Sequence, residues 1–311
     1  MNEFFAGILN GINTVIGNYG WSMVIFTLLF KLIIMPLNYK SRKSMRRMSN
    51  LQPQMTKLQK KYENDKEKLN QKMSELYRKE GVNPMSGCLP MILSMAILII
   101  MFNAMRMVAN NELASQCLEL LTTGVQTNES WLWIKNVFQP DSFTSSILPA
   151  IGDKLMTISP VGYSKVLTAE NIAIAKEFLA SEAYKAAALN YGAEAFKQIQ
   201  LNFLIIRPTL MLPTSFANLF QYANGLFILP ILAGVSQFFM SSVMNGNQVK
   251  KPEAGDTQNP MNSAFMKWFF PLFSLFICSS YNAAFSLYWV MGNIIAAVQN
   301  IGINWYLDNK E

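Results

Sequence analysis

The sequence contains no histidine and only three cysteines, Cys88, Cys117 and Cys278. Without histidine the chain cannot build a Ser-His-Asp triad or a His-ligated metal site, and the cysteines are too far apart for a CxxC motif. Neither GxxxxGK[ST] nor GxGxxG occurs, so the sequence also lacks the phosphate-binding loops of nucleotide-dependent enzymes. We therefore expect no enzymatic activity, no catalytic residue, no metal and no cofactor.

Charge is scarce as well. Only 14% of the residues are charged and 51% are hydrophobic, whereas ordinary soluble domains are about 25% charged. Such a chain needs to hide much of its surface from water, and lipid is the simplest environment for that surface. A membrane-spanning helix needs about 20 apolar residues, and the apolar runs predict five spans. The last two come from dividing residues 265–303 at the polar break Ser279–Asn282.

We expect an all-α polytopic membrane protein whose spans are joined by a helical hairpin and a helical outer region. Residues 1–19 lack a basic n-region and a cleavage site, so an amphipathic helix on the outer membrane surface is expected there rather than a signal peptide. The expected segments are the surface helix (1–19), the spans (20–38, 84–110, 225–244, 268–280 and 283–303), the hairpin (39–83), the outer region (111–224), a loop (245–267) and a tail (304–311).

Charge asymmetry orients these spans. Residues 39–83 contain 13 Lys and Arg against 5 Asp and Glu, whereas residues 111–224 contain 7 against 9. Short loops rich in Lys and Arg stay in the cytoplasm. The hairpin and the loop 245–267 are therefore predicted inside, the N-terminus outside and the C-terminus inside.

The hairpin is predicted from an apolar stripe. Apolar residues recur at steps of three or four before and after Asn64–Asp65, which indicates two helices packed against each other, with Pro53 kinking the first or resetting its start. Basic residues cover the other faces. They serve either as contacts for lipid headgroups or as a docking surface for a ribosome, a targeting receptor or a substrate chain. The residues in question are Arg42, Lys43, Arg46, Arg47, Lys57, Lys60 and Lys61.

Lys31 lies within the first apolar run, Trp21–Leu37. A charge within a membrane helix costs roughly 2.5–3.5 kcal/mol on insertion scales, so it usually faces a polar cavity and marks a functional path. The alternative is snorkelling to the headgroups, which a separation of six residues, about 9 Å, from Leu37 permits. We favour the polar path.

Other polar residues in the predicted spans are candidates for lining the same path. For each of them taken singly, a hydrogen bond across a helix interface or an interfacial aromatic is at least as good an interpretation. These candidates are Thr27, Ser94, Asn103, Ser236, Gln237, Tyr288, Trp289 and Asn293.

Three stretches resemble the YidC/Oxa family of membrane protein insertases. The first is Leu76–Pro90 (LYRKEGVNPMSGCLP), the second is Trp131–Ile134 leading to Pro140-Asp141, and the third runs from Phe270–Phe273 through Leu287–Asn293 to Gln299. Their order and spacing match the family along the chain except in residues 144–222. That outer insertion has no role that the sequence identifies.

The resemblance implies a multi-pass protein of the bacterial plasma membrane, with five helices around a hydrophilic groove open to the cytoplasm and to lipid. It also implies an insertase and chaperone that uses no nucleotide, with nascent membrane proteins and the lipid bilayer as partners. The Sec translocon, the ribosome and the signal-recognition-particle receptor are open as further partners, and no nucleic-acid function is expected. Lys31 occupies the position of the family's groove Arg. It keeps the positive charge but lacks the bidentate fork that grips a carboxylate.

Two other functions stay open. Lys31 could bind the substrate of a small-anion transporter or channel, although the paired internal repeats typical of transporters are not found in the sequence. Alternatively, the chain could be a non-catalytic assembly scaffold beside the Sec translocon, in which the hairpin is essential and the groove charge is dispensable.

Overall fold

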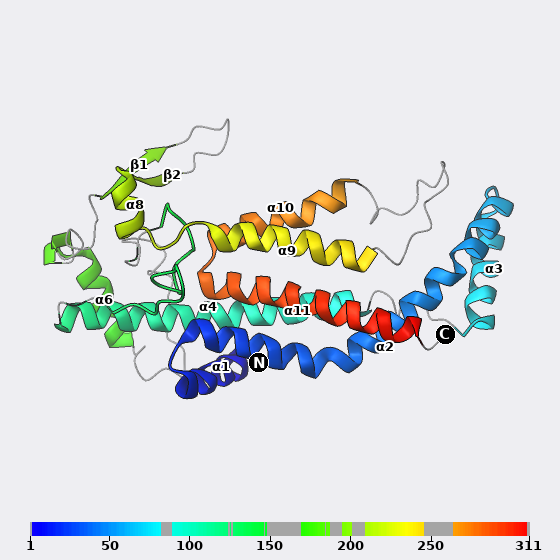
Figure 1. Ribbon diagram of the computed structural model, residues 1–311, viewed down its shortest axis with the longest axis horizontal. Coiled ribbons are helices and arrows are strands. Elements are labelled where there is room, and N and C mark those ends of the chain that lie inside the picture. Colours follow the sequence, from blue (N-terminus) through cyan, green and yellow to red (C-terminus); the bar gives the residue numbers. More distant parts are fainter. Residues whose placement is uncertain are drawn as a thin grey trace.

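In the computed structural model, long helices run side by side along the longest axis of the molecule (Figure 1). The structure describes residues 2–81, 89–123, 125, 127–145, 147, 169–183, 185–186, 195–200, 209–245 and 264–309. The long helices are α2 (Tyr19–Lys61), α4 (Leu89–Thr123), α9 (Ile228–Asn245), α10 (Ala264–Ser280) and α11 (Ala283–Asp308). Helix α11 packs against α2 and α9, and α10 packs on the other side of α9.

Helix α2 is continuous over 43 residues. It begins where Gly17, at φ +71°, turns the chain out of the preceding helix, and the Asn18 side chain accepts a hydrogen bond from the backbone N–H of Trp21 at 3.1 Å. We expected Pro53 to kink the helix or to reset its start. The helix continues through both Pro36 and Pro53, so its start is not reset. Its second half bends away from the bundle (Figure 1).

The N-terminal helix α1 (Asn2–Ile16) packs against α2 and α4. Ala6 and Leu9 are buried in this contact. The ring of Phe5 meets that of Phe30 edge to face, with the centroids 5.6 Å apart. Phe4 lies on the other side of the helix and is 66% exposed. Helix α1 therefore has one face on the bundle and exposes apolar residues on its outer side, among them Phe4, Ile8 and Val15.

Helix α3 (Lys66–Lys79) folds back along the end of α2. Asp65 caps it by accepting a hydrogen bond from the backbone N–H of Lys68 at 3.0 Å. The hydroxyl of Tyr77 donates to Met55 Sδ across the two helices at 3.8 Å. The apolar residues of the predicted stripe are half-buried, whereas most of their neighbours are exposed; they are Met55, Leu58, Tyr62, Leu69, Met73 and Leu76. We call this end of the molecule the hairpin end.

The shared hydrophobic core lies in the opposite half of the bundle. It joins the first turns of α2, α9 and α11 to the middle of α4. Its buried side chains include Tyr19, Met23, Phe26, Met101, Met105, Val108, Leu229, Ala233, Phe285, Leu287, Tyr288 and Val290. This half is therefore closed by apolar packing.

Residues 127–145 cover the helix ends beside this core, and we call this the cap end. Backbone carbonyls of Val137 and Gln139 accept from the first N–H groups of α11, each at 2.9 Å. The buried Asp141 carboxylate accepts from the backbone N–H of Leu229 at 2.7 Å, in the first turn of α9. These amides have no partner inside their own helices, so the cap supplies the hydrogen bonds that two helix starts need.

Asn136 and Asn224 hold the cap together. The backbone N–H of Asn136 donates to Asn224 Oδ1 at 2.8 Å, and Asn224 Nδ2 donates to the carbonyls of Asn136 and Pro140 at 2.9 Å. Asn136 Nδ2 also donates to Gln116 Oε1 on α4 at 2.8 Å. Asn136 and Asn224 are fully buried, so their polar atoms are satisfied inside the protein, as burial requires.

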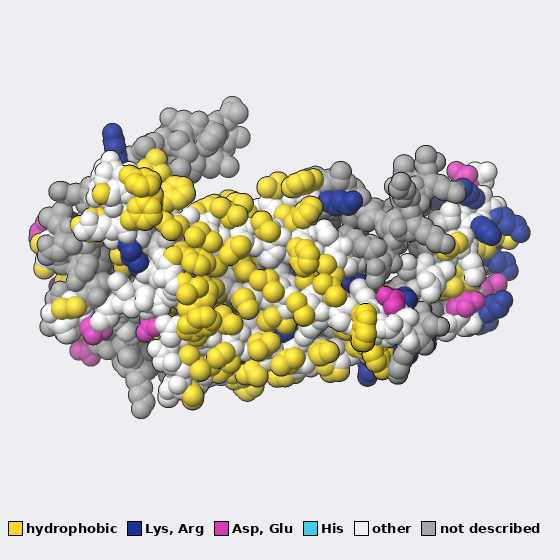
Figure 2. All heavy atoms as spheres, in the orientation of Figure 1, with side chains coloured by type: hydrophobic (Ala, Val, Ile, Leu, Met, Phe, Trp, Pro, Cys, Tyr) yellow, Lys and Arg dark blue, Asp and Glu magenta, His cyan; other side chains and the backbone are white. Residues whose placement is uncertain are grey.

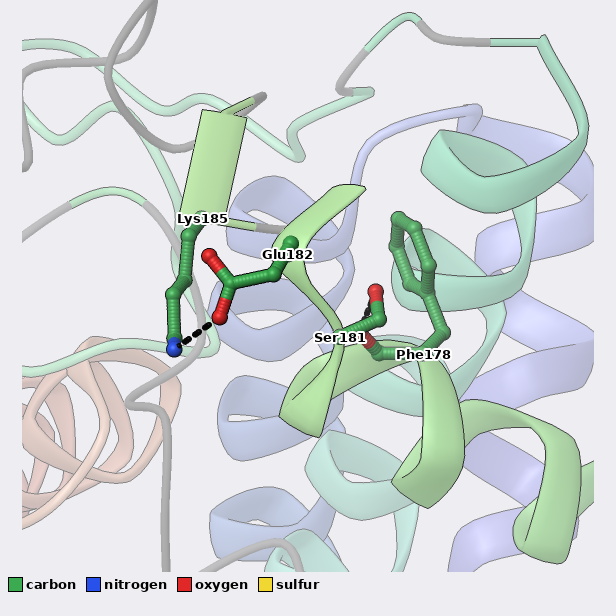
Figure 3. Close-up of polar contacts among 4 residues, drawn as sticks. All are labelled: Phe178, Ser181, Glu182 and Lys185. Atoms are coloured by element: carbon green, nitrogen blue, oxygen red, sulfur yellow. Dashed lines mark hydrogen bonds and ion pairs between the residues drawn. The ribbon is translucent and has the colours of Figure 1, made fainter.

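The region between α4 and α9 contains both helices and strands. Helix α6 (Ala169–Ala180) packs along α4, and just after it Lys185 pairs with Glu182 at 2.5 Å (Figure 3). Strands β1 (Phe196–Gln200) and β2 (Thr209–Pro213) pair antiparallel, and α8 (Phe216–Tyr222) follows. Our expectation of a purely helical outer region was therefore wrong for β1 and β2. A large part of the predicted insertion 144–222 lies outside the described residues.

On the face of the bundle that Figure 2 shows, hydrophobic side chains form a broad belt between the two ends. Among the described residues, two helices, Tyr19–Leu51 and Ala283–Asp308, are long and apolar enough to cross a membrane, and shorter apolar helices cover Ile228–Met244 and Lys267–Ser280. The exposed side chains of the belt include Leu28, Leu32, Ile33, Val235, Phe239, Trp268, Leu272, Phe276, Ile294 and Val298. A surface of this kind fits lipid rather than water.

Candidate functional site

Lys31 lies against α11. It stands twelve residues into α2, about 18 Å along the helix axis. A Cβ added to Gly292 would lie 3.5 Å from Lys31 Cε and 3.9 Å from Lys31 Nζ, so the lysine side chain passes directly over this glycine. Gln299 Nε2 donates to the backbone carbonyl of Lys31 at 2.9 Å. Lys31 is half-buried and forms no ion pair with any acidic side chain that the structure describes.

The shared hydrophobic core reaches to about the depth of Lys31, and the buried residues beyond it include both polar and apolar side chains. Beyond Lys31, the buried residues that the structure describes on α2 are Arg42 and Leu51. On α9, Ser236 is buried and accepts a hydrogen bond from Asn293 Nδ2 at 3.2 Å. Toward the hairpin end, the polar residues Arg42 and Asn300 are buried beside the apolar residues Leu51, Ala297, Ile303 and Leu307.

On the helix that packs against Lys31, two buried polar atoms lack a hydrogen-bond partner among the described residues. They are Gln299 Oε1 and Trp289 Nε1, both on α11. An unsatisfied buried polar atom costs about 1–3 kcal/mol, so water or a polar group of a bound chain would stabilise this region. The arrangement offers a cation, a hydrogen-bond acceptor and a hydrogen-bond donor within one stretch of α2 and α11.

The predicted site residues have different surroundings in the structure. Ser236 and Asn293 are bonded to each other, and Trp289 lies on the same helix as Gly292. Thr27 is fully buried and donates to the carbonyl of Met23 at 2.7 Å, so its hydroxyl is used within α2. Of the others, Tyr288 is buried in the core, Gln237 and Asn103 are half-buried, and the Ser94 side chain lies outside the described residues.

Arg42 does not lie where the sequence suggested. We expected a contact with lipid headgroups or a partner, but this residue is only 7% exposed. Arg42 Nε donates to Asn300 Oδ1 at 2.6 Å, and Nη1 donates to the carbonyl of Met244 at 3.4 Å. The expectation was therefore wrong for Arg42, because its guanidinium joins α2 to α9 and α11 instead of pointing outward.

The other basic residues of the hairpin lie nearer the surface. Arg46 pairs with Asp308 at the end of α11 at 2.6 Å. The remaining five predicted contact residues are exposed: Lys43, Arg47, Lys57, Lys60 and Lys61. Figure 2 shows Lys and Arg side chains gathered at the hairpin end, over α3 and the last part of α2.

Sequence reasoning missed Gly292, Gln299 and Asn300 as site residues. Gly292 and Gln299 are seven residues apart, two turns of a helix, and therefore share a face. Both lie in the stretch that suggested the family, so this spacing was a usable signal. The pairing of Asn300 with Arg42 joins residues 258 positions apart, and no local pattern indicates it.

Long helices with an apolar exterior and a shared core at one end fit a membrane protein built mainly of helices. The model of the family described as 60Kd inner membrane protein matches residues 11–175 and 188–310. The chain belongs to this family, the YidC/Oxa family.

Individual relatives agree with this assignment. The chain is 36% identical over 151 residues to the membrane protein insertase YidC of Fusobacterium nucleatum, which covers 49% of this chain and 65% of that protein. It is 38% identical over 153 residues to the membrane protein insertase YidC of Leptospira interrogans, and the matched segment covers 47% of this chain and 22% of that protein. It is 27% identical over 305 residues to the membrane protein insertase YidC of Chlorobaculum tepidum, and the matched segment covers 98% of this chain and 36% of that protein. The chain spans less than two thirds of the length of each of these relatives.

Proposed function

We propose that the chain is a membrane protein insertase and foldase, in which the polar region around Lys31 forms a hydrophilic groove. The observation that carries the proposal is the placement of Lys31. Its ammonium group lies over Gly292 at the depth where the hydrophobic core ends, without an acidic partner among the described residues. An unpaired cation at this depth is costly, and an acidic residue of an incoming chain would offset that cost.

The step that needs help is the passage of a hydrophilic tail. Each unsatisfied polar group that enters lipid costs several kcal/mol. Water and polar side chains between Lys31 and the hairpin end shorten the apolar distance that the tail crosses. The cation attracts carboxylates of the tail, and the apolar segment behind it then partitions into lipid along the exposed apolar belt. This partitioning drives the step, so no nucleotide hydrolysis is required.

The hydrophobic core at the cap end fits entry of the tail from the hairpin end. We propose that the hairpin end is cytoplasmic and the cap end extracytoplasmic, in the plasma membrane, with five helices crossing the bilayer. The exposed basic residues of the hairpin then face the compartment in which nascent chains arrive. They offer a surface for anionic lipid headgroups, the ribosome or the signal-recognition-particle receptor, and action beside the Sec translocon is compatible with the same orientation.

The test is insertion of a single-spanning substrate with an acidic N-terminal tail into liposomes that contain only this protein. Native protein, Lys31→Arg and Lys31→Ala are compared by protection of the tail from protease. We expect native protein and Lys31→Arg to insert the substrate and Lys31→Ala to insert less. Insertion no greater than in empty liposomes, by a correctly folded protein, would refute autonomous insertion and favour a scaffold. A small-anion transporter would instead show anion flux that requires Lys31 in the absence of any substrate chain.

A further inference from the structure

Helix α8, in the part of the chain that departs from the family pattern, has two faces. Leu219 and Tyr222 pack against Ala223 and Ala195. On another side of the helix, Phe216 and Phe220 point outward and are 76% and 54% exposed. Their rings meet edge to face with the centroids 5.0 Å apart. A pair of exposed aromatic rings on one face of a helix is an apolar surface without a partner in the described protein.

The position of α8 is fixed by the cap. Lys135 Nζ donates to the carbonyls of Phe220 and Gln221 at 2.7 and 2.5 Å, and so holds the last turn of the helix. The chain then passes through the buried Asn224 and enters α9 at Ile228. Helix α8 therefore lies at the cap end of α9, at the level where the apolar belt stops. Figure 2 shows hydrophobic side chains over α8 at the margin of that belt.

We propose that α8 is a membrane-surface anchor, whose Phe216 and Phe220 insert into the bilayer interface at the cap end. Lipid is the occupant that the structure favours, because the aromatic face continues the apolar surface of α9 and α10, which faces lipid. Helix α8 (FANLFQY) carries no charged residue, so apolar insertion holds it and attraction to anionic headgroups is not needed.

The anchor complements α1. In Figure 1, α1 and α8 lie on opposite sides of the bundle at its cap end. Helix α1 packs on α2 and α4 and exposes Phe4, whereas α8 precedes α9. With an interfacial helix on each side, the cap end is held level with the membrane surface and the bundle resists tilting. This proposal concerns lipid contact and does not depend on the proposed insertase activity.

The experiment places nitroxide spin labels on single cysteines at α8. Phe216→Cys and Phe220→Cys report on the aromatic face, and Ala217→Cys and Gln221→Cys, both exposed positions of the same helix, are the matched controls. The background carries Cys88→Ser, Cys117→Ser and Cys278→Ala and is checked for the native gel-filtration profile. The proteins are reconstituted into lipid nanodiscs, either zwitterionic or containing phosphatidylglycerol. Collision rates with oxygen, which concentrates in lipid, and with a water-soluble nickel chelate are then measured.

We expect the ratio of oxygen to nickel collisions to be several-fold higher at 216 and 220 than at 217 and 221, in both kinds of nanodisc. Equal, water-like ratios at all four positions would overturn the proposal, because α8 would then stand clear of the membrane. Low collision rates with both reagents at 216 and 220 would also overturn it, because a protein surface rather than lipid would cover the rings. A high ratio only in anionic nanodiscs would replace apolar anchoring with headgroup attraction.

Discussion

Lys31 of α2 lies over Gly292 of α11, with Lys31 Cε 3.5 Å from the point where a Cβ of residue 292 would stand. A side chain that extends beyond Cβ at 292 would occupy the space through which the lysine passes. The two residues are far apart in the sequence, yet the absence of a side chain at one sets the position of the charge at the other. Gly292 is therefore part of the proposed groove although it carries no functional group.

Gly292→Leu is expected to displace the Lys31 ammonium and to lower insertion of acidic-tailed substrates, while Gly292→Ala, whose Cβ would make an ordinary contact, has little effect. The matched control is Gly302→Leu on the same helix, because a Cβ at 302 meets nothing within 4 Å. The liposome assay with protease protection measures the effect. Equal activity of Gly292→Leu and Gly302→Leu would show that the position of Lys31 over α11 is unimportant.

Arg42→Ala should destabilise the bundle at the hairpin end. The substitution leaves the buried Asn300 side chain and the Met244 carbonyl without their donor, at a cost of about 1–3 kcal/mol for an unsatisfied buried group. Thermal unfolding in detergent should show a lower midpoint. Arg47→Ala, on an exposed position of the same helix, should change stability by less than about 0.5 kcal/mol. If both variants melt alike, Arg42 does not join the helices.

Asp141→Ala should weaken the cap. The carboxylate accepts from the backbone N–H groups of Phe227 and Leu229 and from Trp133 Nε1, at 2.7–3.1 Å. Loss of these bonds should cost about 2 kcal/mol or more. Asp308→Ala, which breaks only the partly exposed pair with Arg46, should cost less than about 1 kcal/mol. Hydrogen exchange at the first amides of α9 measures the local effect, and unchanged protection in Asp141→Ala would contradict this role.

Glu112 makes the stability of the α1–α2–α4 junction sensitive to pH. It lies beyond the predicted span 84–110 and accepts a hydrogen bond from the Tyr19 hydroxyl at 2.8 Å. Burial, and then the negative charge of Glu129, raise the pKa of Glu112 above its ordinary value of 4.5. The folded protein thus binds this proton more tightly than the unfolded chain does. The resulting stability is complete below pH 4.5 and is lost as the pH rises through the raised pKa.

Glu112→Gln keeps an oxygen that accepts from Tyr19 but removes the titrating charge. The variant should therefore melt at a higher temperature than the native protein at neutral pH, and the difference should shrink as the pH falls toward 4.5. Melting midpoints across this range measure the effect. A constant difference between the two proteins would exclude Glu112 as the titrating group.

The sequence predicted the features that local chemistry determines. The apolar run around Lys31, the stripe of the hairpin and the break before α11 each follow from periodicity or from turn residues. The boundary between the first span and the hairpin has no counterpart in the backbone, because α2 is one helix from Tyr19 to Lys61. A change of surroundings from lipid to water does not end a helix, and the two prolines bend it at most.

Contacts between distant segments could not be predicted. Arg42 stands in a basic cluster that is typical of headgroup binding, and only its approach to Asn300 reveals the buried bond. Strands β1 and β2 were missed because FKQIQ and TLMLP are short, contain few β-branched residues and lack a clear apolar alternation. They form because each strand supplies the hydrogen-bond partners of the other, and neither segment alone predicts that pairing.

The most direct test of the groove charge varies the substrate and Lys31 together. A series of single-spanning substrates, with tails that carry no, one, two or three carboxylates, is inserted into liposomes containing either native protein or Lys31→Gln. If Lys31 attracts acidic tails, the ratio of native to variant insertion rises with each added carboxylate and approaches one for the uncharged tail. A ratio that stays constant across the series would contradict electrostatic attraction by Lys31.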